Sequence, residues 1–537
     1  MEGSTHARAT TVVVLSLLAF VALVVRIAFD VDGALDTDTI SFGLAAFHFD
    51  ILQHQPHPPG YPGYVVYLKV IHLVARWLGP LEVAKWGSRI AGAASVPAAY
   101  WACRRLLWLG EPRALCSAGF VVVSPVLWYY GADGQAHAAE ALLALVLLGA
   151  VAAARSGGPA SLRRVLLVVA AFGLAGSIRP TIPTLLSPLL VWLLWGRPLR
   201  DWAAGALAGA ISVAVWFVPL VLVTGGWDLY RRAGNEVHEL FVATFSILGE
   251  RVTVARAARN VSFAGYSAVL ACVPLLAWVR ARGQTAAGVR AWRSACLSAA
   301  ALSTLFFAVV YTAESGYFAG VAALACLAPA TWPAVPSLRP RLRAALVIAG
   351  AVAFVLAGPA EIQAIGAKAR LPLPTLAHVA EVDRGLRLYR SVVCGAAGDE
   401  PTLVLTDNPV TTHSRWLPLA CPDVVVGLHM EGSTIAPDLD VWLLFERWSL
   451  VSLPTRVPLE AGPPVRYQVR PVRRVVVVPD ATDEFVERVA RQASCRPMAG
   501  LAGQAGQPWP DGPMVWPARC LPELKLGAHT LVLAEPR

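Results

Sequence analysis

Charged side chains are scarce in this sequence. Asp, Glu, Lys and Arg together make up 15% of the 537 residues, whereas hydrophobic residues make up 56%. Soluble globular domains carry about 25% charged residues. The deficit excludes an ordinary soluble protein and indicates a polytopic α-helical membrane protein. The chain also lacks any internal repeat or low-complexity tail.

Zinc-type cysteine spacing is absent as well, because none of the nine cysteines forms a Cys-x-x-Cys pair. Five cysteines lie in apolar segments, and four lie in the polar C-terminal portion: Cys394, Cys421, Cys495 and Cys520. An even set permits disulfides if that portion faces an oxidising compartment. Unpaired cysteines buried for packing are an equally good interpretation.

The apolar stretches predict about eleven spans, since each is long enough to cross a hydrocarbon core. They are residues 11–28, 83–108, 114–130, 136–154, 163–178, 181–196, 202–224, 262–280, 294–312, 317–335 and 341–358. Because so many spans follow the first, we expect it to be an uncleaved helix rather than a signal peptide.

The net charge of +10 does not indicate a nucleic-acid partner, because most basic residues fall in short loops between these stretches. Arginines gather in every second loop, which makes those loops cytoplasmic under the positive-inside rule. We therefore expect a cytoplasmic N-terminus. The outward-facing segments would be 29–82, 131–135, 179–180, 225–261, 313–316 and everything after residue 359.

The first outward loop, 29–82, concentrates carboxylates, histidines and prolines. Asp36 and Asp38 precede a short apolar segment that suits a surface helix, and residues 61–80 suit a second one. One carboxylate could act as a base toward an acceptor hydroxyl. The pair could instead bind a divalent cation or cap the following helix, and the spacing alone favours capping.

Two histidines of this loop, His54 and His57, have a spacing that would place both on one face of a helix, as zinc ligands require. Pro56, Pro58 and Pro59 argue against a helix there, because proline removes donors and extends its neighbours. We expect an extended segment whose histidines bind a phosphate or hydroxyl, or serve only the loop.

Four further polar residues lie at the outer ends of spans: Asp133, His137, Glu140 and Arg179. An ionisable side chain inside a membrane is expensive and is a functional candidate by default. A lipid phosphate would be one partner for Arg179. A salt bridge to a loop aspartate or a headgroup contact would be another.

Residues 359–537 predict a separate extracytoplasmic α/β domain, of a size that folds alone. Short apolar runs at 402–406, 423–428, 440–445 and 473–479 have strand length, and an amphipathic helix is expected at 481–494. The membrane domain would then comprise residues 1–358.

The run from Asp38 to Tyr64, with its motif HQPHPPGYP at residues 54–62, resembles bacterial membrane proteins of the DUF2723 type. These are related to the protein O-mannosyltransferases of family 39, within the GT-C glycosyltransferases. Residues 124–140 and 173–193 resemble later spans of that group. The similarity covers residues 11–335 and leaves the C-terminal domain out.

This resemblance implies inverting transfer of a sugar from a polyprenyl-phosphate donor to an acceptor hydroxyl of a protein, lipid or glycan at the outer face. Asp38 would be the base, with Asp36 as its alternate. Arg179 would lie near the donor phosphate, and the expected substrate contacts are His54, His57, Tyr61, Asp133, His137 and Glu140.

The chain departs from the group's pattern at Ala132, where a glutamate is expected and Asp133 stands next in sequence. Residues 314–318 also lack the Arg-Tyr pair of some relatives. Two other functions therefore remain open. One is a transporter or flippase of a lipid-linked glycan, and the other is a non-catalytic membrane scaffold.

Overall fold

The computed structural model describes residues 2–107, 111–155, 161–238, 242–250, 252–278, 287–328, 338–366, 369–407, 411–431, 439–452, 457–458, 465–478, 481–498, 513–526 and 529–533. The chain divides into two compact units. The first comprises Met1–Asp30 and Ser41–Glu381, and the second comprises Val31–Ile40 and Val382–Arg537.

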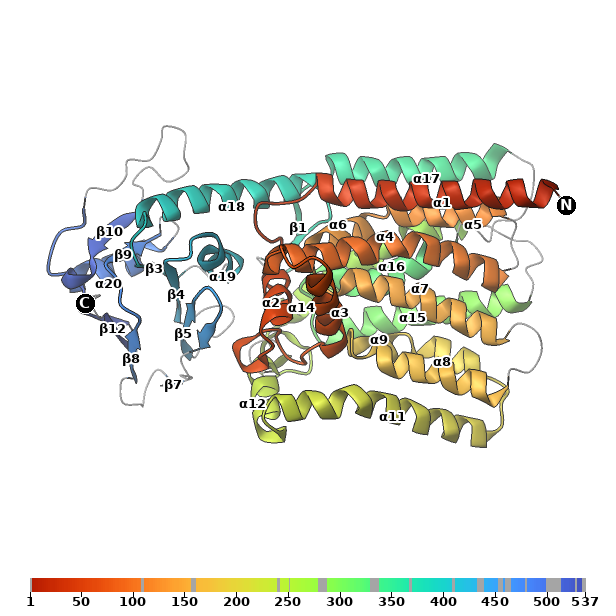
Figure 1. The fold of residues 1–537 in the computed structure, drawn as a ribbon, viewed down its shortest axis with the longest axis horizontal. Helices are drawn as coiled ribbons and strands as arrows, with labels where there is room; N and C mark the ends of the chain where they lie inside the picture. The colour runs from red at the N-terminus through yellow and green to blue at the C-terminus, as the bar shows by residue number, and fades with distance from the viewer. Residues whose placement is uncertain are drawn as a thin grey trace. The chain divides into compact units, whose positions relative to one another are not determined.

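The longest helices of the first unit lie lengthwise beside one another (Figure 1). Outside the first loop this unit is built mainly from helices. In chain order they are α1 (Glu2–Ala28), α4 (Pro80–Leu107), α5 (Glu111–Val123), α6 (Pro125–Asp133), α7 (His137–Arg155), α8 (Leu162–Ala175), α9 (Thr181–Leu185), α10 (Ser187–Leu194), α11 (Leu199–Val223), α12 (Trp227–Val237), α13 (Ala243–Phe245), α14 (Val254–Cys272), η3 (Val273–Trp278), α15 (Ala287–Val309), η4 (Ser315–Phe318), α16 (Ala319–Ala325) and α17 (Leu338–Ala357).

A helix lies at each expected span, but fewer helices meet a length and apolarity criterion for crossing a membrane. Among the described residues these are Ala9–Ala28, His137–Arg155, Leu199–Val223 and Trp292–Val309. Helices α5 and α6 pass together as one pair bent by 57°, at Pro125, which cannot donate a helical hydrogen bond. The total of about eleven spans stays a prediction.

Two short helices lie in the first loop where surface helices are expected, α2 (Thr37–Phe47) and α3 (Pro62–Val74). Between them a single 3-10 turn, η1 (Ile51–Gln53), is followed by non-helical chain through Tyr61. His54 and His57 therefore share no helix, as the prolines predict, and the zinc-helix interpretation is excluded.

Small residues allow close packing between helices of the first unit. The ring of Trp101 on α4 covers Gly149 on α7 so closely that any Cβ there would collide with it. Small side chains at such crossings are typical of membrane helices.

One buried arginine lies in the last turns of α1. Arg26 has no exposed surface, and its guanidinium donates to the backbone oxygens of Ala22 (2.7 Å) and Leu127 (2.9 Å). A Cβ at either Gly92 on α4 or Gly131 on α6 would collide with the guanidinium. Both glycines are thus required by the volume of this side chain.

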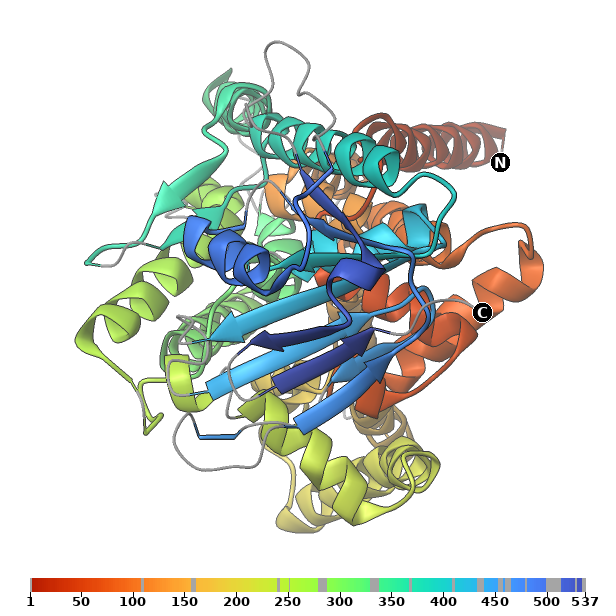
Figure 2. The ribbon, with the colours of Figure 1, turned by 90° about the vertical axis from the view of Figure 1, so that its left-hand side faces the viewer.

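The second unit contains a mixed sheet with strand order β10-β9-β3-β4-β5-β6, and β7 also pairs with β5 (Figure 2). Strands β9, β3 and β4 are mutually parallel, and the other pairs are antiparallel. Its elements are α18 (Leu376–Ala397, beginning in the first unit), β3 (Thr402–Thr406), α19 (Thr411–Ala420), β4 (Val424–Glu431), β5 (Leu439–Phe445), β6 (Leu450–Ser452), β7 (Val457–Pro458), β9 (Arg474–Val477), α20 (Asp483–Gln492) and β10 (Met514–Pro517).

A smaller sheet of the same unit has the order β11-β12-β8, formed by β8 (Val465–Val469), β11 (Glu523–Leu526) and β12 (His529–Leu533). Strands lie at all four positions expected from the sequence, and α20 lies at the expected helix. The four C-terminal cysteines, left open by the sequence, form the disulfides Cys394–Cys421 and Cys495–Cys520.

The boundary of this unit differs from the expected one. The compact unit begins at Val382 rather than at residue 359, and residues 359–381, with the hairpin β1 (Glu361–Gln363) and β2 (Arg370–Pro372), belong to the first unit. The unit also takes in Val31–Ile40 from the first loop. Contacts between residues so far apart in the sequence produce no hydrophobic periodicity, so the sequence could not predict which unit residues 31–40 join.

Candidate functional site

A buried ionic cluster lies in the first unit, at the turns that join its helices. Arg179 follows α8 and is 6% exposed, and its Nη1 lies 2.7 Å from Oε2 of Glu140, one turn into α7. The same Nη1 donates to Nδ1 of His137, the first residue of α7. Within the chain the arginine thus has an anionic partner, which is a span glutamate rather than the loop aspartate weighed from the sequence.

His137 has a different partner at each of its ring nitrogens. A guanidinium can only donate, so Nδ1 accepts from Arg179 and the ring hydrogen sits on Nε2. That Nε2 lies 2.6 Å from Oε1 of Glu314, which precedes η4. His137 therefore links the arginine to a second carboxylate.

A third carboxylate, Asp133, joins the cluster through an amide. Gln135 Nε2 donates to Oδ2 of Asp133 (2.8 Å) and to Oε2 of Glu314 (3.2 Å). Asp133 is the last residue of α6, and Gly134 ends that helix in the left-handed conformation (φ 94°). The turn between α6 and α7 thereby delivers Asp133, Gln135 and His137 to one place.

Aromatic rings line the cluster. The Arg179 guanidinium lies over the ring of Tyr317, 5.0 Å from its centroid, and Tyr61 is near enough to interact with it electrostatically. The Tyr61 hydroxyl lies 3.2 Å from Nε2 of His57, and Phe42 of α2 packs edge-on against both rings. The proline-rich segment and the turns of the bundle thus meet at Arg179.

His54 has a backbone role in the loop. It ends η1 in the left-handed conformation (φ 53°), and its N–H donates to the Ile51 oxygen at 3.1 Å. The structure therefore brings together six of the expected residues: His57, Tyr61, Asp133, His137, Glu140 and Arg179.

The two loop aspartates differ in their contacts. Oδ1 of Asp36 accepts the backbone N–H of Asp38 at 2.8 Å, so Asp36 caps α2, which begins at Thr37. Asp38 lies in the first helical turn, where the helix dipole stabilises a carboxylate. Capping, the alternative that the spacing favours, thus fits Asp36 and leaves Asp38 for chemistry.

In the part of the chain that the structure describes, no group of three or more His, Cys, Asp or Glu side chains is arranged to hold a metal ion. A divalent cation at Asp36 and Asp38 remains a prediction from the sequence.

Sequence reasoning missed Glu314, Gln135 and Tyr317. A signal for the first was present, because Glu314 is an isolated carboxylate in the short segment between two apolar stretches. The departure at residues 314–318 drew attention to the absent Arg-Tyr pair rather than to the glutamate that is there.

Glu314→Leu is expected to reduce the free energy of unfolding by about 1–3 kcal/mol, because the N–H groups of His137 and Gln135 lose a buried acceptor. Glu314→Gln keeps one oxygen and should lose less. Denaturant titration in detergent micelles measures both. Glu381→Leu, at an exposed glutamate of α18, is the matched control, and equal stability of the two Leu variants would contradict the assignment.

Comparison with solved structures gives the fold. ArnT from Cupriavidus metallidurans in the apo state matches at 14% identity and a TM-score of 0.54, covering 100% of both chains. The chain has the fold of ArnT. The same ArnT bound to undecaprenyl phosphate matches at 14% identity and 0.54, over 99% of this chain and 100% of ArnT.

The mycobacterial arabinofuranosyltransferase AftD matches at 14% identity and a TM-score of 0.44, over 94% of this chain and 39% of AftD. No protein-family model and no curated protein matches the sequence.

Proposed function

We propose that the protein is a membrane glycosyltransferase that moves a sugar from a polyprenyl-phosphate donor to an acceptor hydroxyl, with inversion at the anomeric carbon. The observation that carries this proposal is the full-length likeness to ArnT, which has been solved with undecaprenyl phosphate. The buried ionic cluster around Arg179 supports it.

Arg179 is suited to the leaving phosphate. Among the residues that the structure describes, both hydrogen bonds of its guanidinium use Nη1. Nη2 and Nε can therefore donate to phosphate oxygens. Glu140 and His137 hold the guanidinium in place. A preorganised cation of this kind stabilises the charge that develops as the sugar–phosphate bond breaks.

Asp38 is the proposed base. A carboxylate with a pKa of about 4 cannot remove a hydroxyl proton in advance, so the proton moves as the acceptor oxygen bonds to the sugar. The donor is already activated, and the protein mainly positions both substrates and accepts that proton.

The motif at residues 54–62 supports the finer placement beside the DUF2723 and protein O-mannosyltransferase group. We place the N-terminus in the cytoplasm, and the site and the C-terminal unit outside it. The arginine pattern of the loops supports this topology, and so do the two disulfides, which persist in oxidising compartments.

The test is turnover by the purified full chain with a panel of polyprenyl-phosphate sugars and hydroxyl acceptors. We expect release of free polyprenyl phosphate together with a product of inverted anomeric configuration, read by NMR. A parallel reaction with chelator tests the cation at Asp36 and Asp38. Passage of intact donor across proteoliposomes without bond cleavage would indicate a flippase, and neither cleavage nor passage would indicate a scaffold.

A further inference from the structure

The ten residues that precede and include the start of α2 are held by the second unit. Val31–Ile40 group with Val382–Arg537 although more than three hundred residues separate them in sequence. This segment carries Asp38. The elements that contact the segment therefore determine where the proposed base lies.

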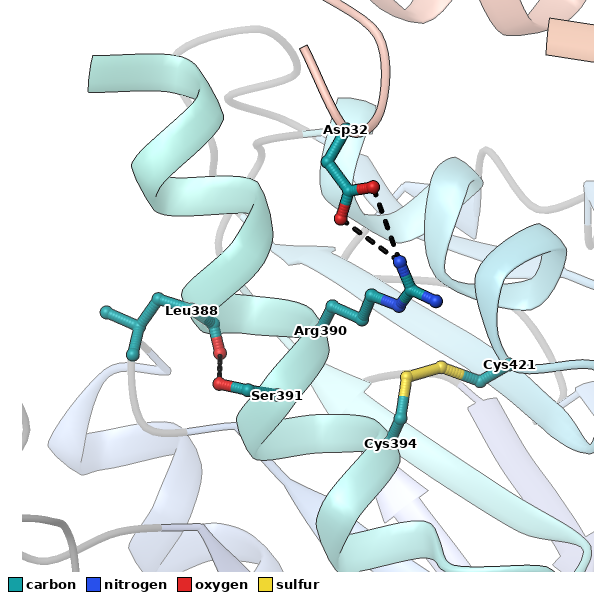
Figure 3. Close-up of a disulfide and its surroundings, with 6 residues drawn as sticks. All are labelled: Asp32, Leu388, Arg390, Ser391, Cys394 and Cys421. Carbon is teal, nitrogen blue, oxygen red and sulfur yellow. Dashed lines mark hydrogen bonds and ion pairs between the residues drawn. A yellow bond between two sulfur atoms is a disulfide. The ribbon is translucent and has the colours of Figure 1, made fainter. Parts of the chain in front are cut away.

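Helix α18 contacts the segment through hydrogen bonds to Asp32 (Figure 3). Nη1 of Arg390 lies 3.1 Å from Oδ2 and 3.3 Å from Oδ1 of Asp32. The backbone N–H of Asp32 donates to Oδ1 of Asp383 at 2.8 Å. Three hydrogen bonds from two side chains thus fix both the side chain and the backbone of one loop residue.

The next residue, Gly33, lies against two helices of the unit, α18 and α19. A Cβ at Gly33 would approach Leu386 of α18 to 2.9 Å and the indole of Trp416 on α19 to 3.0 Å. Cys394 of α18 is bonded to Cys421, directly after α19. The two helices that contact the segment are therefore covalently joined.

Arg415, the neighbour of Trp416 on α19, interacts electrostatically with Asp38. The arginine is 4% exposed, and burial lowers the pKa of its guanidinium to about 10, while the Asp38 carboxylate acts in the opposite direction. A buried cation next to a carboxylate favours the ionised carboxylate. The N-terminal dipole of α2 acts on Asp38 in the same sense.

We propose that Arg415 is a positioning residue that keeps the Asp38 carboxylate ionised and oriented. This inference rests on the proposed function, because it gives Asp38 its role as base. Arg415 touches no reacting atom in this scheme and acts through Asp38 alone.

The experiment compares pH profiles of kcat/KM for the full chain and for Arg415→Met and Arg415→Lys. Loss of the positive charge should move the acidic limb of the profile up by about 1 pH unit, whereas Arg415→Lys should keep the limb near its wild-type position. The donor KM should stay unchanged in both. Arg466→Gln, which removes an exposed ion pair with Glu523 in the same unit, is the matched control.

A second readout does not depend on activity. Hydrogen exchange of residues 31–40 in the intact protein should become faster in Arg415→Met and in Asp32→Asn, and should stay unchanged in Arg466→Gln. Asp32→Asn keeps both Arg415 and Asp38, so it should lower kcat without moving the acidic limb. This variant decides the question if Arg415→Met fails to fold, since wild-type exchange and kcat in Asp32→Asn would overturn the inference.

The outcomes separate the two proposals. An active wild type whose Arg415→Met variant keeps the wild-type acidic limb overturns the role of Arg415 and leaves the proposed function standing. A wild type that never cleaves any donor defeats the proposed function, and the positioning role falls with it even if exchange shows that the segment is held.

Discussion

Asp38→Asn is expected to slow sugar transfer by a factor of about 10²–10⁴, the usual contribution of a general base. The amide keeps the shape of the side chain but cannot accept the acceptor's proton. The donor KM should hold, because the lost interaction forms only in the transition state. Initial rates of polyprenyl phosphate release measure both constants.

Two neighbouring aspartates supply controls for this result. Asp36→Asn should keep most activity, because asparagine caps a helix about as well as aspartate does. Asp50→Asn should also keep it, since the carboxylate of Asp50 accepts from Leu52 N and Gln53 Nε2 within the loop. If Asp36→Asn loses as much activity as Asp38→Asn, the base is not Asp38 alone.

Arg179→Met is expected to reduce the free energy of unfolding by about 3–5 kcal/mol, because it leaves the buried Glu140 carboxylate without its cation. Transfer should also be lost, since the leaving phosphate is no longer neutralised. Denaturant titration and transfer rates give the two effects separately. Arg370→Met, at an exposed ion pair with Glu361, should lose no more than about 1 kcal/mol.

The double variant Arg179→Met with Glu140→Met separates folding from catalysis. Replacing both members of a buried pair with apolar side chains is often neutral or stabilising, so stability should return towards that of the wild type. Activity should not return. A double variant that transfers sugar at the wild-type rate would show that Arg179 serves the fold only.

Local sequence patterns predicted the elements well. Apolar stretches predict the helices of the first unit, and short Val-rich runs predict β3 and β9. The prolines at 56, 58 and 59 predict the non-helical segment before α3. Each of these features is set by neighbours within about a dozen residues, which is the range over which periodicity and proline geometry act.

The site was predictable only in part. Arg179 and Glu140 stood out because a charge is rare in an apolar stretch. Their pairing with each other, and the link through His137 to Glu314, depend on how distant turns meet. The same holds for Arg415, which looks like an ordinary helix residue in the sequence and becomes significant only through its electrostatic interaction with Asp38.

The setting of Arg26 has a consequence for biosynthesis. Translation makes α1 before α4 and α6, and α1 carries a charge that lipid solvates poorly. The Leu127 carbonyl that accepts from this arginine is translated 101 residues later, and Gly92 and Gly131, which make room for it, also come later. The buried setting of Arg26 is therefore complete only once α4 and α6 are present.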